Sequence, residues 1–279
     1  MSTAIPAIDA LKSELKTMWS RARRPSFVGL LVLALGALPL PKVSADLIVL
    51  CPRAVETAVG RTADDFHAQG GPRVEFVLGT AGDLSKRAAA GERADVVIGT
   101  TQGVEDIDRR GRVLVQGTRV ELGRVGVAVK AGAPRPDIST PEALRQTLLK
   151  AASLGYADPA RGGTGGTHFA AVLERLGIAE AVRPKTRLYP QGVHALEAVA
   201  RGEVELAITP ISEIVVRVER LSLVSPLPGD LQRRLSYSAA VLAVSPSPDA
   251  AKAFVARLAG PGGRQRFMAA GFEPPESPR

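Results

Sequence analysis

The sequence has little of the chemistry that marks several protein classes. Its 279 residues include one cysteine, Cys51, one tryptophan, and only 4% aromatic residues. A single cysteine cannot form an internal disulfide, and no cysteine–histidine spacing suits zinc, so we expect neither a metal nor another cofactor. Cys51 ends the apolar run Leu47–Cys51. The simplest expectation for it is a small buried side chain.

Positive charge is only mildly in excess once the N-terminal segment is set aside. The formal net charge is +8, and residues 1–45 carry six basic and two acidic side chains. The remainder has 30 basic and 26 acidic residues, a net charge of +4, with no dense run of lysine and arginine. We therefore expect no nucleic-acid partner. A modest positive bias does suit a small anionic ligand.

The first 45 residues have the layout of a secretory signal peptide. Arginines within 21–24 precede the apolar stretch 27–40, and small residues at 43–45 allow cleavage after Ala45. The stretch is shorter than the about 20 residues that span a membrane, although an uncleaved anchor is the alternative. A start at Met18 would give a more conventional leader. We expect residues 1–45 to be a signal peptide and the protein to be periplasmic.

Short apolar runs alternate with helical periodicity along the rest of the chain. The order β-α-β-α-β from Leu47 to Ile98 predicts a parallel sheet covered by helices. A second unit begins near Ser153. Its Gly202-Glu203 turn is similar in sequence to Gly91-Glu92 in the first unit. The similarity is either a coincidence or a sign that the chain has two lobes of similar construction. Strands are expected at 47–51, 73–78, 95–98, 125–130, 153–157, 186–189, 205–209, 221–224 and 237–244, with short extended pieces at 113–115 and 118–122.

The segment Asp158–His168 is a glycine-rich turn that leads into a helical pattern over 169–176. Glycines allow positive φ and close approach of a ligand. The start of a helix offers unpaired N–H groups and a partial positive charge, so this turn is predicted to hold an anion. The alternative is an ordinary connection with a threonine cap. The turn lacks the lysine of a phosphate loop, and no Gly-x-Ser-x-Gly turn occurs in the chain.

Five segments occur in a familiar order: Leu47–Cys51, Gly79–Leu84, Ala88–Ile98, Ala157–Pro159 and Ala200–Glu203. Together they resemble the periplasmic molybdate-binding-protein family, the type II solute-binding proteins of ABC importers. The resemblance covers nearly the whole chain after residue 45 and is more specific to the fold than to the ligand. It implies an α/β, two-lobe periplasmic-binding-protein type II fold with mostly parallel sheets and two crossover strands. Lobe 1 would comprise 46–125 plus 235–279, lobe 2 would comprise 126–234, and the crossovers would lie near 125–129 and 225–237.

The resemblance also implies a ligand site in the cleft, where the carboxyl ends of the strands meet. Relatives that bind molybdate use serine hydroxyls, backbone N–H groups and a tyrosine, but two of those side-chain donors are absent here. Arg53 follows the first strand instead, and its planar guanidinium can bind a carboxylate through two hydrogen bonds. The alternative is that Arg53 is an ordinary solvated loop residue. The candidate ligand-binding residues are Arg53, Ala54, Thr80, Ala81, Gly82, Thr164, Gly165, Gly166, His168, Val193, His194 and Pro210.

Two functions follow from this resemblance. The first is a monomeric periplasmic receptor that captures a small anion, an organic carboxylate or a molybdate-like oxyanion, for the membrane permease of an ABC importer. It needs no catalytic residue, and the sequence favours it. The alternative is a small-acid isomerase of the aconitate-isomerase kind, since some relatives isomerise tricarboxylates. Its base would be His168, His194 or Glu213, and their spacing does not choose among them.

Overall fold

The computed structural model describes residues 46–273, without the side chains of 116–122. The predicted signal peptide lies outside the described residues, as do the last six residues of the predicted first lobe. Within the described part of the chain, no helix is long and apolar enough to cross a membrane.

The first of two five-stranded sheets has the order β2-β1-β3-β10-β4. Strand β1 (Leu47–Pro52) pairs in parallel with β2 (Val74–Gly79) and with β3 (Val96–Thr100). Strand β10 (Leu235–Leu242) lies antiparallel between β3 and β4 (Val113–Gly123). The apolar runs at the sheet centre are fully buried, which is why they carry no alternating polar residues.

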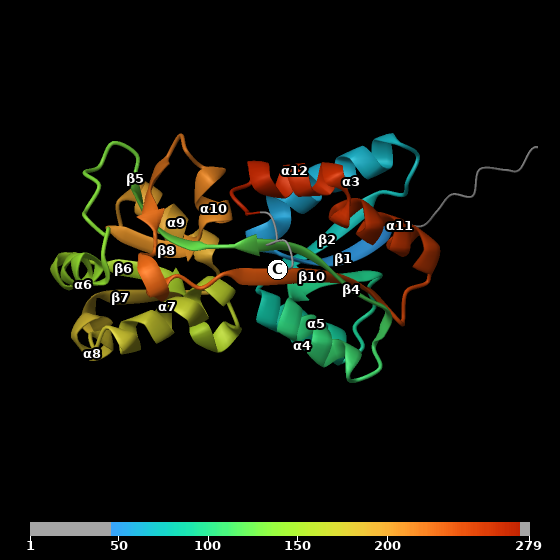
Figure 1. Cartoon of the computed structure of the whole chain (residues 1–279), viewed down its shortest axis with the longest axis horizontal. Coiled ribbons are helices and arrows are strands. Elements are labelled where there is room, and N and C mark those ends of the chain that lie inside the picture. The colour runs from blue at the N-terminus through green and yellow to red at the C-terminus, as the bar shows by residue number, and fades with distance from the viewer. Residues whose placement is uncertain (1–45, 274–279) are drawn as a thin grey trace, which may run out of the picture. The chain divides into compact units, whose positions relative to one another are not determined.

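The second sheet has the order β7-β6-β8-β5-β9. Strand β6 (Leu154–Ala157) pairs in parallel with β7 (Thr186–Tyr189) and β8 (Leu206–Pro210). Strand β5 (Val125–Lys130) lies antiparallel between β8 and β9 (Leu221–Pro226). In Figure 1 this sheet and its helices lie on the left, and the first sheet lies on the right.

Both sheets follow one plan. Four strands of each run in one direction, and the reversed strand, β10 or β5, comes from the part of the chain that connects the two sheets. The sheets are therefore mixed: most strands share a direction, but half of the pairings are antiparallel. The two Gly-Glu turns precede β3 and β8, which hold the same place in their sheets. The echo in the sequence thus marks equivalent elements of two lobes.

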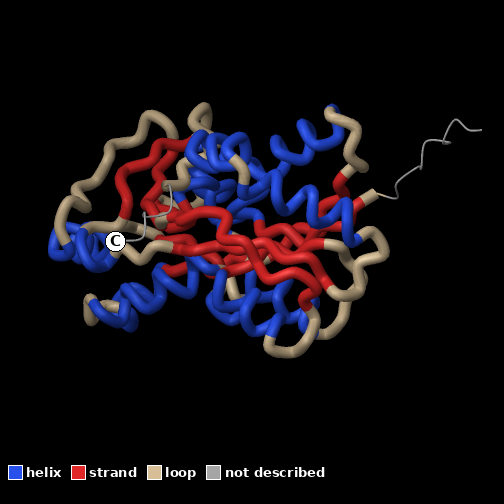
Figure 2. The backbone as a smooth tube through the Cα atoms, turned by 45° about the vertical axis from the view of Figure 1, so that its right-hand side comes forward, coloured by secondary structure: helices blue, strands red, loops and turns tan. Residues whose placement is uncertain are grey.

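Helices flank the sheets, as the blue segments around the red strands show (Figure 2). Short 3-10 turns lie at Arg53–Val55, Pro159–Arg161, Arg183–Lys185 and Gly229–Leu231. The helices are α3 (Glu56–Ala68), α4 (Ala81–Ala89), α5 (Thr101–Asp108), α6 (Pro141–Lys150), α7 (Thr164–Arg175), α8 (Ala179–Val182), α9 (Gly192–Arg201), α10 (Ile211–Val215), α11 (Pro248–Ala259) and α12 (Pro261–Ala269).

Three local expectations from the sequence need correction. The extended pieces at 113–115 and 118–122 form one strand, β4, because β10 pairs with it along its whole length. Helix α7 begins at Thr164, within the glycine-rich segment, rather than near residue 169. The four-residue helix α8 was not expected, since so short a helix has no periodic pattern of its own.

Candidate functional site

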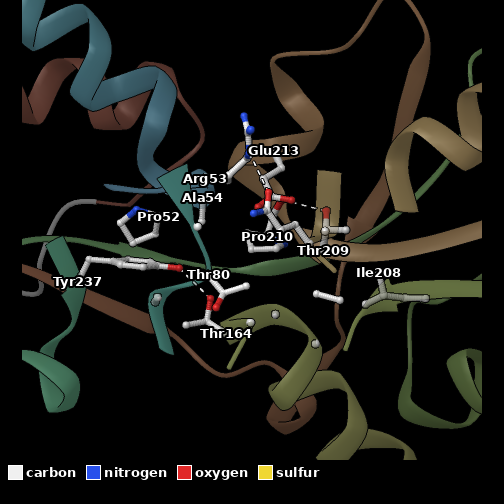
Figure 3. A pocket seen from close by; sticks show the side chains of 18 residues that line it. Pro52, Arg53, Ala54, Thr80, Thr164, Ile208, Thr209, Pro210, Glu213 and Tyr237 are labelled. Carbon is white, nitrogen blue, oxygen red and sulfur yellow. Dashed lines mark hydrogen bonds between the residues drawn. The ribbon is translucent and has the colours of Figure 1, made fainter. Parts of the chain in front are cut away.

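A cavity lies where the carboxyl ends of parallel strands from both sheets meet. Its lining includes Pro52 of β1, Gly79 of β2, Ala157 of β6 and the end of β8 at 208–210. The free space inside this cavity is small in this conformation, about 30 Å³. Figure 3 shows side chains from both lobes around this space.

Helices α4, α7 and α9 begin at this cavity. The N-cap residue and first residue of each line it: Thr80 and Ala81, Gly163 and Thr164, and Gln191 and Gly192. Thr80 caps α4 by accepting a bond from the Asp83 N–H at 3.1 Å, whereas no side chain caps α7 or α9. Helix starts carry partial positive charge and unpaired N–H groups, so the lining suits an anion.

The glycines at the start of α7 serve packing. A Cβ on Gly166 would lie 1.8 Å from the Ala157 carbonyl oxygen, and one on Gly165 would lie 2.7 Å from Pro210 Cδ. Within the segment that was expected to need positive φ, only Gly162 has it, at +69°. These two glycines therefore let the first turn of α7 sit directly on the ends of β6 and β8.

Arg53 links the two lobes at one side of the cavity. Its Nε donates to Gln191 Oε1 at 2.8 Å, and its Nη1 pairs with Glu56 Oε2 at 3.1 Å. The Arg53 side chain is about one third exposed, at 34%. Some of the Arg53 N–H donors are therefore already used in hydrogen bonds within the protein. The side chain helps to hold the two lobes together and also adds positive charge to the site.

Further hydrogen bonds join the lobes around the cavity. The Gly82 N–H donates to the Gly162 carbonyl at 3.1 Å, and Thr80 Oγ1 donates to the carbonyl of Arg161. Ser212 Oγ donates to the Ala54 carbonyl at 2.6 Å and is buried. This conformation is therefore closed, with backbone and hydroxyl groups of one lobe bound to the other.

A hydroxyl pair stands inside the lining. Thr164 Oγ1 and the phenolic oxygen of Tyr237 are 2.9 Å apart, and the dashed line in Figure 3 marks this bond. Tyr237 is only 1% exposed, and its burial raises the pKa of the phenol, so the group is neutral near pH 7. Sequence reasoning missed Tyr237, because it lies at the start of the strand that returns from the second lobe, far in sequence from Thr164.

Glu213 is a buried carboxyl in the same lining. It is 7% exposed, and the loss of water raises its pKa to about 7, although Arg217 and Arg53 act to lower it. Among the described residues, no donor binds its Oε2. A carboxyl that is half ionised near neutral pH can both accept and return a proton, which suits a general acid–base group.

The structure brings most of the predicted ligand-binding residues together, and their role toward a ligand stays a prediction. Gly82 and His168 lie in the wall of a neighbouring cavity, where His168 Nε2 is 2.9 Å from the Leu231 carbonyl and burial lowers the imidazole pKa. Val193 and His194, on α9, line neither of these two cavities. The main cavity is lined by Arg53, Ala54, Thr80, Ala81, Thr164, Gly165, Gly166 and Pro210.

Comparison with known proteins places this geometry in a family. A family model described as bacterial extracellular solute-binding protein matches residues 47–273. The chain is 31% identical over 264 residues to an aconitate isomerase from Pseudomonas sp, covering 89% of this chain and 98% of that protein.

Solved structures agree on the fold. The Azotobacter vinelandii periplasmic molybdate-binding protein superposes with a TM-score of 0.68 at 17% identity, covering 82% of this chain and all of that one. The sulfate-binding protein SubI from Mycobacterium tuberculosis superposes with a TM-score of 0.67 at 18% identity, covering 83% and 87%. The chain therefore has the two-lobe type II periplasmic-binding-protein fold.

Proposed function

The chain belongs to the bacterial extracellular solute-binding protein family, and from this premise we propose that it isomerises a small tricarboxylate such as aconitate. The observation that carries the proposal is the Glu213 carboxyl, buried in an anion-suited cavity with a pKa of about 7. The sequence alone favours a receptor. The match to an aconitate isomerase along nearly its whole length supports the isomerase better.

The reaction needs one base and no cofactor. Aconitate has a methylene group and a vinyl C–H on either side of a central carbon. When a base removes a methylene proton, the electron pair of that C–H bond forms a new double bond to the central carbon. The π electrons of the original double bond move to the vinyl carbon. Protonation of the former vinyl carbon completes the shift, and the product has the opposite geometry about its double bond. One C–H bond breaks and one forms, so a single carboxyl can take and return the proton.

Glu213 is suited to this step by its surroundings. A pure receptor for an anion gains nothing from a buried carboxylate in its lining, because like charges repel. An isomerase needs such a group, and a base works best when its pKa lies near the operating pH. The starts of α7 and α9, which no side chain caps, supply N–H groups for the substrate carboxylates. Closure of the lobes keeps bulk water away from the intermediate.

A periplasmic receptor for an importer is the second candidate. It draws support from the family match and from the closed, interlobe position of the cavity. In that role the permease of an ABC importer would be the partner, and the chain would act as a monomer in the periplasm. The ligand would be a small carboxylate or an oxyanion, held by helix starts and Arg53.

Proton NMR of the purified chain with cis-aconitate in D₂O separates the two functions. The isomerase gives trans-aconitate, reaches the same final ratio from either isomer, and exchanges methylene protons for deuterium. Glu213→Gln should lower the rate by at least about 100-fold, while the exposed control Glu219→Gln should not change it. Binding without turnover or exchange would overturn the isomerase in favour of the receptor.

A further inference from the structure

The Thr164–Tyr237 hydroxyl pair has one proton that its own hydrogen bond does not use. Two hydroxyls bring two O–H protons, and the bond between them at 2.9 Å takes one, whichever atom donates. Among the described residues, neither oxygen makes a second hydrogen bond. Both residues line the main cavity. The second proton is therefore available to an acceptor inside the cavity.

The pair has the character of a neutral donor. Burial keeps Tyr237 as a phenol, so it does not repel an anion. Thr164 is the first residue of α7, where the helix start adds partial positive charge. The pair also spans the lobes, since Tyr237 belongs to β10 of the first sheet and Thr164 follows β6 of the second. It is complete only when the lobes close.

We propose that the Thr164–Tyr237 pair stabilises the charge that develops when Glu213 removes the proton, by donating one hydrogen bond to the substrate carboxylate next to the reacting carbon. The inference rests on the proposed isomerase function. When the methylene C–H bond breaks, its electron pair spreads over the allyl unit and onto that carboxylate. A preoriented donor stabilises the reaction most at this stage, because that carboxylate then carries more negative charge than it does in the ground state.

The same strand carries a matched control. Ser238, the next residue, pairs its Oγ with Thr101 Oγ1 at 3.0 Å, and neither residue lines the main cavity. Ser238→Ala therefore removes a buried hydroxyl from the same strand without touching the proposed site. Thr164→Ser keeps the hydroxyl of the pair, whereas Thr164→Val removes it at nearly constant volume.

The experiment measures kcat and KM for cis-aconitate and the Kd for tricarballylate, a saturated analogue that cannot react. Tyr237→Phe and Thr164→Val should each lower kcat by about 100-fold, with the tricarballylate Kd changed less than about threefold. The double variant should be no slower than either single one, since the residues act as one unit. Ser238→Ala should keep the rate of the original chain, and Thr164→Ser should recover most of the rate that Thr164→Val loses.

Each other outcome overturns the pair's role. If kcat is unchanged in Tyr237→Phe and Thr164→Val, the pair makes no contribution. Equal losses in kcat/KM and in tricarballylate affinity would mean that it only holds the lobes closed. Thermal unfolding of each variant separates a loss of folding from these effects. An original chain without turnover overturns the proposed function itself, whereas an active chain with an equally active Tyr237→Phe overturns this inference alone.

Discussion

The carboxyl of Glu213 lies directly over Gly192, the first residue of α9. A Cβ built on this glycine would come within 2.5 Å of Glu213 Oε2 and within 3.2 Å of Thr209 Cγ2. Glu213 Oε2 is the end of a side chain that is only 7% exposed, so the carboxyl has to shift when residue 192 gains a side chain. The Glu213 carboxyl can therefore occupy this position because residue 192 has no side chain.

Gly192→Ala should displace the Glu213 carboxyl and lower kcat by about 10-fold or more, because misplacement of a reacting group by about 1 Å costs up to 100-fold. Residue 192 has no positive φ, so α9 itself tolerates alanine. Gly262→Ala is the control, because its nearest contact is 3.5 Å away at the flexible end of Arg266. Steady-state kinetics of both variants check the prediction. Unaltered kinetics in Gly192→Ala would argue against Glu213 as the base.

The isomerisation rate should rise with pH through about 7. Glu213 must be ionised to accept a proton, and its pKa in the folded chain is about 7. The ratio kcat/KM reports the ligand-free protein, so it should fall about tenfold for each pH unit below that value and level off above it. Initial rates measured between pH 5 and pH 9 test this pH dependence directly. A flat profile across that range would assign the base to another group.

Folding stability should fall as pH rises through the same range. The pKa of Glu213 is raised from 4.5 to about 7 in the folded chain, so the folded state favours the protonated form. This contribution is fully present below pH 4.5 and is lost as pH rises through about 7. At one pKa unit per 1.36 kcal/mol, the loss is about 3 kcal/mol. Glu213→Gln cannot titrate and should lack this part of the pH dependence.

Urea unfolding at pH 5 and pH 8 measures that difference. The original chain should lose about 2–3 kcal/mol more than Glu213→Gln between the two conditions. Other titrating groups are common to both proteins, so they cancel in the comparison. Equal losses would show that the Glu213 carboxyl is ionised in the folded chain well below pH 7.

The sequence predicted the elements whose signals are local. The strand at 125–130 matches the structure because short β-branched runs between turn residues are typical of strands. Helix α6 could be placed from Thr140 and Pro141, an N-cap followed by proline. The two lobes followed from the order of such signals together with the family resemblance.

The sequence could not predict the pairings that close the site. Tyr237 meets Thr164 across 73 residues, and Arg53 meets Gln191 across 138, so neither pair has a local pattern. Glu213 was one of three candidate bases. Its burial distinguishes it from His168, and burial depends on how α9 and α10 pack. A pKa shift of this kind is a property of the folded environment.

Gly82→Ala should weaken ligand binding with little effect on folding. The Gly82 N–H bonds the Gly162 carbonyl across the lobes, and a Cβ at residue 82 would lie 2.7 Å from Gly162 Cα. That clash exists only when the lobes are closed, so the variant should favour the open form. Because ligand affinity falls with the population of the closed state, the Kd for trans-aconitate should rise by about tenfold or more.

Gly60→Ala is the control for this variant. Residue 60 lies inside α3, and a Cβ there meets nothing within 4 Å. Alanine in a helix interior should stabilise the chain by about 0.5–1 kcal/mol relative to glycine and leave the Kd unchanged. Small-angle X-ray scattering with and without trans-aconitate adds the structural readout: Gly82→Ala should stay expanded at ligand concentrations that compact the original chain. If Gly82→Ala compacts and binds like the original chain, the Gly82–Gly162 contact does not limit closure.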